Sequence, residues 1–268
     1  MIYITGDMHG NFKRISRKSR FRRLAQPTEK DYVIVCGDLG LLWQEDEELL
    51  YNLEIMSRYP FTLLWVQGNH ENYDMIEKYP LEYWNGKGGK VRHIVRDKVI
   101  LLERGQIFQI EGKRFFTFGG ASSHDVQGGI LDPQSPTFYE EKKAAFRSDL
   151  SFRIKNISWW EHELPTEEEI QEARRNLERA NWQVDYVISH CPSTRMIKEI
   201  CARYGLHNSY KMDVLTDFFD ELEDKLAFKA WYFGHMHGEV KVDDRHYLMY
   251  ENFEMIEPGM NQDTGKHL

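Results

Sequence analysis

Five short segments constrain the fold of this chain more than any other feature, because each places His or Asp beside Gly or Pro directly after a β-prone run. The clearest follows the apolar run Phe61 to Val66, which leads into Gly68-Asn69-His70-Glu71. An apolar run bounded by polar residues and Gly indicates a buried strand that ends in a tight turn. Open α/β sheets carry their chemistry at such strand ends. The other four segments are Asp7-Met8-His9-Gly10, Gly37-Asp38, Ser189-His190-Cys191-Pro192 and Gly234-His235-Met236-His237-Gly238.

The first part of the chain alternates strands with helices. Strands are predicted for residues 2–5, 31–36 and 61–66, and a helix for 44–59, where Leu49, Leu53 and Met56 have helical spacing. The helix has an acidic start, and Pro60 ends it. This order is typical of βαβ units in an α/β protein.

The pattern changes after a short helix predicted at 73–78. Four β-prone runs, 91–95, 99–102, 106–110 and 115–118, predict a β meander in a mixed or second sheet. A capping box at Thr166 to Glu169 predicts a helix from about Glu167 to Ala180. Strands at 184–189 and 229–233, a helix at 213–226 and a hairpin of 239–243 with 246–250 complete the expected order.

We predict one domain over residues 1–268, with a loop or small insertion at about 122–157. That stretch holds Gly128-Gly129, two prolines and many charges, and it is expected to be partly helical near 139–147. Long ordered loops are often functional, but no residue pattern here names a role. The pair Trp159-Trp160 is expected to pack rather than to take part in chemistry.

Charge and cysteine content limit the classes of function. Lys plus Arg number 35 and Asp plus Glu 43, a formal charge of −8, which argues against a general nucleic-acid binder but not against a metal-dependent nuclease. Three cysteines without paired spacing, no signal peptide and no apolar run of membrane length predict a soluble cytoplasmic protein. Seven basic residues between Lys13 and Arg23 form either a solvated helix face or a positive rim that attracts anionic substrate.

The five segments supply two carboxylates, four imidazoles and one carboxamide, with no thiolate. This mixture suits Mn²⁺, Fe or Zn²⁺. It is too rich for one ion and right for two, provided that one carboxylate bridges them. Two divalent ions about 3.5–4 Å apart clamp the attacking and departing oxygens of a phosphoryl transfer. The candidate metal ligands are Asp7, His9, Asp38, Asn69, His190, His235 and His237.

In their order along nearly the whole chain, the five segments resemble the five blocks of the calcineurin-like metallophosphoesterase superfamily. The resemblance implies an α/β fold of two mixed sheets, face to face, flanked by helices in four layers. It implies that a hydroxide between the two metals attacks phosphorus in line. His70 would stabilise the developing charge or protonate the leaving oxygen. By the same resemblance, Asp7, His9 and His237 would hold the first metal, Asn69, His190 and His235 the second, and Asp38 would bridge them.

Leu41 and Leu42 depart from the Ser/Thr protein phosphatase branch, which has an Asp partner for the catalytic His and a phosphate-binding Arg at these positions. We therefore expect a member outside that branch, in which His70 has another partner. The expected activity is hydrolysis of a phosphomonoester or phosphodiester with two divalent ions, Mn ahead of Fe or Zn. The expected substrate is a small phosphorylated molecule, a nucleotide among the candidates. A nuclease and a non-catalytic metal-binding scaffold are the alternatives.

Overall fold

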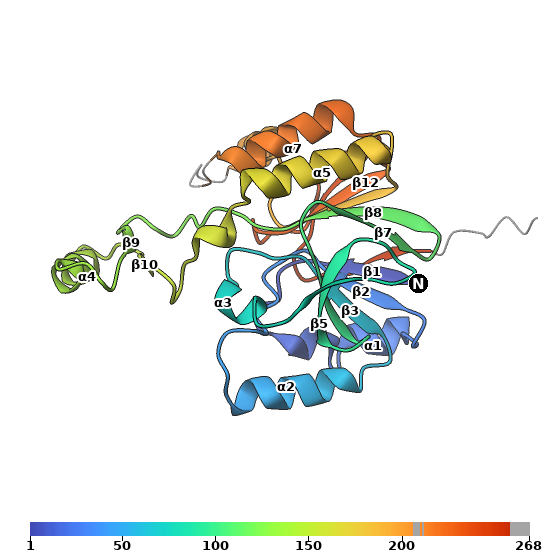
Figure 1. Ribbon diagram of the computed structural model, residues 1–268, viewed down its shortest axis with the longest axis horizontal. Helices are drawn as coiled ribbons and strands as arrows, with labels where there is room; N and C mark the ends of the chain where they lie inside the picture. Colours follow the sequence, from blue (N-terminus) through green and yellow to red (C-terminus); the bar gives the residue numbers. More distant parts are fainter. Residues whose placement is uncertain (206–209, 211, 258–268) are drawn as a thin grey trace, which may run out of the picture.

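The computed structural model describes residues 1–205, 210 and 212–257, so the end of the predicted 1–268 domain lies outside the described residues. Two mixed sheets lie face to face, and helices cover the outer face of each (Figure 1). The four-layer α/β sandwich expected from the resemblance is confirmed.

The first sheet contains seven strands in the order β15-β1-β2-β3-β6-β5-β4. The strands β1, β2, β3 and β6 are parallel, while β15, β5 and β4 run antiparallel to their neighbours. Three helices pack on its outer face (Figure 1). The elements are β1 (Ile2–Thr5), β2 (Tyr32–Val35), β3 (Thr62–Trp65), β4 (Leu81–Tyr83), β5 (Lys90–Val95), β6 (Val99–Leu102) and β15 (Glu254–Ile256), with α1 (Arg20–Ala25), α2 (Glu47–Ser57), α3 (Tyr73–Ile76) and the 3-10 helix Phe12–Ile15.

The second sheet contains six strands in the order β13-β14-β12-β11-β8-β7, parallel from β14 to β8. Its outer helix α5 begins with the predicted capping box, in which the Thr166 and Glu169 side chains each accept a hydrogen bond from the other's backbone N–H. The elements are β7 (Gln106–Ile110), β8 (Lys113–Phe118), β11 (Tyr186–Ser189), β12 (Ala230–Phe233), β13 (Val240–Lys241) and β14 (His246–Leu248), with α5 (Glu167–Arg179), α6 (Thr194–Tyr204) and α7 (Val214–Lys225).

Alternating side chains build the layers. In β1, Ile2 and Ile4 face the second sheet, whereas Tyr3 packs against the helix layer. Successive residues of a strand point to opposite faces, so one apolar strand contributes to two cores. The inner core joins residues of both sheets, such as Leu64 from β3 and Ile188 from β11. This packing holds the parallel strands of the two sheets in a fixed relation.

The predicted meander is divided between the two sheets, which corrects the expectation of a continuous one. The hairpin β5–β6 belongs to the first sheet and the hairpin β7–β8 to the second. Arg104, between β6 and β7, is buried, and its guanidinium donates to the carbonyls of Gly119, His162 and Leu164. These bonds hold the segment between β6 and β7, where the chain passes from the first sheet to the second, against residues of the second half of the chain. The strands β4 and β15 and the helix α6 were not predicted.

Residues 122–157 form an arm that extends away from the sandwich (Figure 1). It contains the parallel pair β9 (Ile130–Leu131) and β10 (Arg153–Ile154), and α4 (Phe138–Arg147), which confirms the helix expected near 139–147. At its base, just before the 3-10 helix Glu161–Glu163, Trp160 is buried with its ring nearly perpendicular to that of Trp43, as expected of a packing residue. Within the described residues, no helix has the length and apolarity needed to cross a membrane.

Candidate metal centre

The five predicted segments meet at one place, where β1, β2 and β3 of the first sheet and β11 and β12 of the second end. The polypeptide brings together groups as far apart as Asp7 and His237, which lie next to each other. Most of the candidate ligands are buried, and His9 and His237 reach the surface. Three sets of ligand atoms each lie within 4.8 Å of one another: Asp7, His9 and His237; His9, Asp38 and His70; and Asp7, Asp38 and His190.

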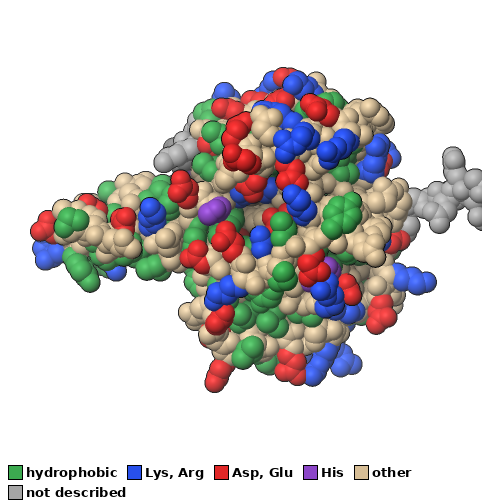
Figure 2. Space-filling model, viewed as in Figure 1, with side chains coloured by type: hydrophobic (Ala, Val, Ile, Leu, Met, Phe, Trp, Pro, Cys, Tyr) green, Lys and Arg blue, Asp and Glu red, His purple; other side chains and the backbone are tan. Residues whose placement is uncertain are grey.

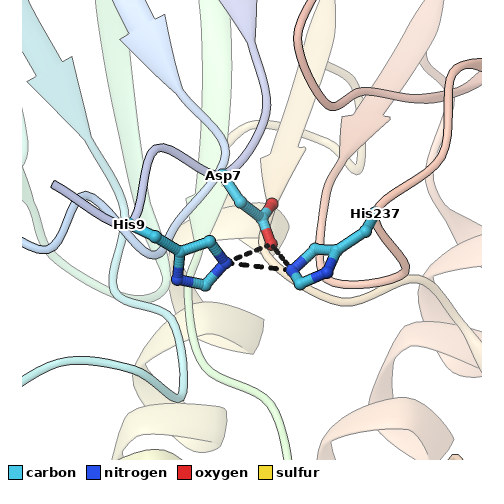
Figure 3. A group of neighbouring side chains, drawn as sticks. All are labelled: Asp7, His9 and His237. Atoms are coloured by element: carbon cyan, nitrogen blue, oxygen red, sulfur yellow. Dashed lines mark hydrogen bonds and ion pairs between the residues drawn. The ribbon is translucent and has the colours of Figure 1, made fainter. Parts of the chain in front are cut away.

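Asp7, His9 and His237 form a compact cluster near the surface, in which the two imidazoles are exposed and Asp7 is buried. Figure 3 shows the three side chains turned toward one another. His237 Nε2 lies 3.1 Å from Asp7 Oδ2 and 2.9 Å from His9 Nε2, and His9 Nε2 lies 3.7 Å from Asp7 Oδ2. Ligand atoms around a tetrahedral ion with bonds of about 2.1 Å lie about 3.4 Å apart. The three side chains therefore fit around one divalent ion.

A second cluster lies deeper and is centred on His190. Its Nε2 is 3.1 Å from Asn69 Oδ1 and 3.4 Å from Asp38 Oδ2. Its Nδ1 donates to the Cys36 carbonyl at 2.8 Å, which leaves Nε2 facing Asn69 and Asp38. The ring of His235 lies 5.0 Å from that of His190, centroid to centroid.

Asp38 lies between the two clusters. Its Oδ2 is 3.4 Å from His190 Nε2 and 3.9 Å from His9 Nε2. Its Oδ1 accepts from the His70 backbone N–H at 2.7 Å, which fixes the direction of the carboxylate. A ligand shared by two ions needs this central position.

Four candidate ligands have left-handed backbone. The φ angles are 46° at His9, 48° at Asp38, 67° at His235 and 47° at His237. Such angles are costly for residues other than Gly and cluster at functional sites. The glycines Gly10 and Gly37 of the same segments also have positive φ angles, of 74° and 93°, so the turns place this demand on both the ligands and their neighbours.

Three glycines of the segments serve close approach between segments. A Cβ on Gly234 would lie 2.0 Å from Asp7 Oδ1, and one on Gly68 would lie 2.0 Å from Asp38 Oδ1. Only Gly37 also has a positive φ, and its Cβ would lie 2.2 Å from His190 Nδ1. Each glycine thus makes room for a candidate ligand from a different segment.

The clusters are electrostatically prepared for cations. Burial raises the pKa of Asp38, but the nearby His190, His70 and His9 outweigh it and lower that pKa far below its usual range. Burial opposes charge on His190 too, yet Asp38 and Asp7 raise its pKa to about 9. Without a metal, the deep cluster therefore holds a proton where a divalent ion would displace it. Burial lowers the pKa of His9 and His235, which favours the neutral imidazoles that bind metals.

His70 lies beside the centre and has the partner that the sequence could not identify. Arg153 Nη2, from β10 of the arm, lies 3.2 Å from His70 Nδ1 and 3.1 Å from Nε2. Burial, together with Arg153, lowers the pKa of His70 to about 4 against the opposing effect of Asp38. Leu41 and Leu42, at the positions where the protein phosphatase branch has polar groups, are buried in the apolar layer under the first sheet.

Two buried groups that the sequence did not single out orient Asn69. The Asn69 amide Nδ2 donates to Ser123 Oγ at 3.5 Å, and Ser123 Oγ donates to Glu163 Oε2 at 2.8 Å. The chain of donors turns Asn69 Oδ1 toward His190. Ser123 and Glu163 occur in a Ser-rich turn and an acidic run that resemble ordinary surface sequence, so no local signal marks them.

The basic run at 13–23 is not a uniform solvated face. The guanidinium of Arg14 turns inward and donates to the backbone carbonyls of Asp7 and Tyr250 and to the Thr5 hydroxyl. Arg14 therefore supports the turn that carries Asp7. Arg22 lies over the rings of Tyr59 and Phe61. The exposed remainder of the run can still form the predicted rim: Lys13, Arg17, Lys18, Arg20 and Arg23.

A two-sheet sandwich with carboxylates and imidazoles gathered at its strand ends defines the class of metal-dependent hydrolases. A family model described as calcineurin-like phosphoesterase matches residues 1–239. The chain therefore belongs to the calcineurin-like phosphoesterase family, which uses dinuclear metal sites for phosphoester hydrolysis. A comparison with curated proteins found no match.

Proposed function

We propose that this protein hydrolyses a small phosphomonoester or phosphodiester, with two divalent ions held at the strand ends. The observation that carries the proposal is the position of Asp38, within 3.9 Å of a ligand atom in each cluster. Two ions in adjacent clusters repel each other, so a shared carboxylate stabilises both. The oxygen and imidazole donors fit Mn²⁺ best, with Fe or Zn²⁺ as the other candidates.

The assignment of ligands follows the two clusters. Asp7, His9 and His237 would hold one ion, and Asp38 would contribute to both sites. When bound, the pair supplies Lewis-acid activation of water and of phosphoryl oxygens. The second ion would be held by Asn69, His190 and His235, which is supported by the 3.1 Å contact of Asn69 Oδ1 with His190 Nε2 and by the 5.0 Å separation of the His190 and His235 rings.

His70 acts on the reacting group from beside the ligands. Its backbone is fixed by the bond to Asp38, and its ring lies 5.1 Å from the His9 ring. With its pKa lowered to about 4, the imidazole is neutral at neutral pH and donates through one N–H. We assign it stabilisation of the charge that develops on the phosphoryl or leaving oxygen.

The proposed substrate is small, and a nucleotide is one candidate. A nuclease would need a continuous basic groove. The face in Figure 2 instead mixes acidic and basic side chains, and the formal charge of the chain is −8. Small anions are attracted locally by the bound ions without a basic surface.

Metal analysis combined with two model esters tests the proposal. The purified protein should bind two Mn²⁺ per chain and should hydrolyse 4-nitrophenyl phosphate or its methyl diester. Treatment with a chelator should abolish turnover, and Mn²⁺ should restore it. Two bound metals with no hydrolysis of either ester would favour the non-catalytic scaffold, and turnover of single-stranded DNA alone would favour the nuclease.

A further inference from the structure

The arm places a fixed cation beside the proposed phosphoryl site. Arg153 belongs to β10, which pairs with β9, so its backbone is held by the arm itself. Its guanidinium makes a bidentate pair with Asp125, Nε to Oδ1 at 2.9 Å and Nη2 to Oδ2 at 2.5 Å. The Arg153 side chain is 12% exposed, and Asp125 is 36% exposed. A paired, mostly buried guanidinium is prepared to bind an anion without further ordering.

The guanidinium is not fully used by its protein partners. Nη2 has two N–H groups and both have partners, since one donates to Asp125 Oδ2 at 2.5 Å and the other faces the His70 ring, 3.2 and 3.1 Å from its two nitrogens. Nη1 also has two N–H groups, and among the described residues its one contact is the Ser158 carbonyl, at 3.4 Å, so one N–H remains for an anion.

The distances place Arg153 within reach of a phosphoryl group at the centre. Its Nη2 is 3.1 Å from His70 Nε2, and a ring nitrogen of His70 lies within 4.8 Å of the nearest His9 and Asp38 ligand atoms. An oxygen lies about 2.8 Å from a guanidinium nitrogen that donates to it and about 2.1 Å from a divalent ion that binds it, so a phosphoryl group would fit between Arg153 and the ions.

We infer that Arg153 binds the third non-bridging oxygen of the substrate, and that the arm thereby makes the site selective for phosphomonoesters over phosphodiesters. The inference rests on the proposed function. It names the substrate class of that same site, and it assigns to residues 122–157 a role in recognition.

The chemistry of in-line displacement explains the selectivity. Water forms a new P–O bond, the P–O bond to the leaving group breaks opposite it, and the leaving oxygen takes up a proton. Three oxygens remain around phosphorus, and two of them can face the metal pair. In a monoester the third is anionic and accepts from Arg153. In a diester it carries a carbon substituent, which is a poor acceptor and would collide with Arg153. The guanidinium keeps its proton throughout.

Two esters with the same leaving group isolate this third position: 4-nitrophenyl phosphate and methyl 4-nitrophenyl phosphate. Arg153→Ala should lower kcat/KM for the monoester about 10–100-fold, the effect of losing a charge-assisted hydrogen bond. The diester should change less than about threefold, because no such bond is lost. Arg153→Lys should restore part of the monoester rate. Lys155→Ala removes the same charge from an exposed position two residues away and is the matched control.

Direct binding of inorganic phosphate gives a readout that does not depend on turnover. By calorimetry with the metal-loaded protein, Arg153→Ala should raise the Kd of phosphate about 10–100-fold, while Lys155→Ala should not change it. Equal losses for both esters with an unchanged phosphate Kd would overturn the inference, since Arg153 would then act only through His70 or the fold. If wild type binds phosphate but hydrolyses neither ester, the proposed function fails, and the Kd comparison still tests Arg153.

Discussion

Gly234 is not a candidate metal ligand, yet replacing it with Ala should weaken metal binding by the cluster of Asp7, His9 and His237. The methyl group would lie 2.0 Å from Asp7 Oδ1, whereas Cβ contacts shorter than 3.0 Å are essentially never found. The backbone of this turn cannot move away, because Gly234 N donates to the His190 carbonyl at 2.8 Å and His235 N donates to Asp7 Oδ1 at 3.0 Å. The Asp7 carboxylate must therefore move instead.

The size of the effect follows from that displacement. The carboxylate has to move by about 1 Å, and a misplacement of this size in an active site can cost about 10²-fold in rate. Asp7 is also the carboxylate that lies 3.1 Å from His237 in the surface cluster. We therefore expect Gly234→Ala to weaken binding of the first ion and to lower kcat/KM about 100-fold at fixed Mn²⁺. Loss of the bond from His235 N should lower the free energy of unfolding by about 1–3 kcal/mol.

The assay is a Mn²⁺ titration of kcat/KM together with metal content per chain. Gly112→Ala is the control, because an added Cβ at Gly112 would meet nothing within 4 Å among the described residues. Its φ of +75° adds a backbone strain that Gly234 does not have, and its activity should still match wild type, because the methyl group displaces no ligand. Two tightly bound ions and wild-type kcat/KM in Gly234→Ala would refute the assignment of Asp7 as a ligand.

Three further outcomes are expected. Asp38→Asn should lose activity and bind fewer than two ions per chain by metal analysis, because the central carboxylate is gone; wild-type metal content would contradict the bridging role. His70→Ala should keep both ions and lower kcat by about 10²–10³-fold. If His70 is the general acid, the loss should be larger for alkyl esters than for nitrophenyl esters. Loss of a bound ion in this variant would show that His70 is itself a metal ligand. Burial opposes charge on His246, but Glu223 at 3.1 Å and Asp243 at 2.8 Å raise its pKa. The stability that these pairs contribute is full below the unfolded pKa of about 6.5 and is lost as the pH rises through the folded pKa. In urea denaturation, the difference in free energy of unfolding between wild type and His246→Gln should therefore become smaller as the pH rises. A difference that stays constant with pH would contradict this role of His246.

The strands that carry the centre could be predicted because their signals are local. The apolar run before Gly68 marks a strand and its end within one short window, and the same holds for the runs before Asp7, Asp38 and Gly234. Parallel strands joined by helices align their carboxyl ends, so local signals were sufficient to predict a common site. The assignment of side chains to the two ions depends on interatomic distances, which a sequence does not contain. In the sequence analysis, this assignment came only from the family resemblance.

The division of the meander could not be predicted, because its cause is long-range. Hairpins β5–β6 and β7–β8 look alike in sequence whether they share a sheet or not. The chain leaves the first sheet at Arg104, whose bonds reach His162 and Leu164, about sixty positions later. The edge strand β15 could not be predicted for the same reason, because it is defined by its pairing with β1 at the other end of the chain.

Arg153 shows the same limit at the site. It is 83 positions from His70 and lies in a charged stretch without a motif. The departure at Leu41 and Leu42 indicated that His70 lacked its usual neighbours, and this is the one signal that pointed to a missing group. Residues 122–157 contain several Lys and Arg residues, and the sequence gives no reason to prefer one of them as the partner of His70. Arg153 is identified by its contact with His70 and its pairing with Asp125, and both depend on the fold.

The structural role of the glycines in the five segments cannot be inferred from one segment alone. A Gly before a His or Asp is read as freedom for its own turn, yet Gly68 and Gly234 have φ angles that other residues adopt. What forbids a side chain there is a carboxylate from another segment, Asp38 against Gly68 and Asp7 against Gly234. Each segment therefore depends on a neighbour that is distant in sequence. It follows that the five segments tolerate change only together, and that a lone copy of one carries little evidence of a metal site.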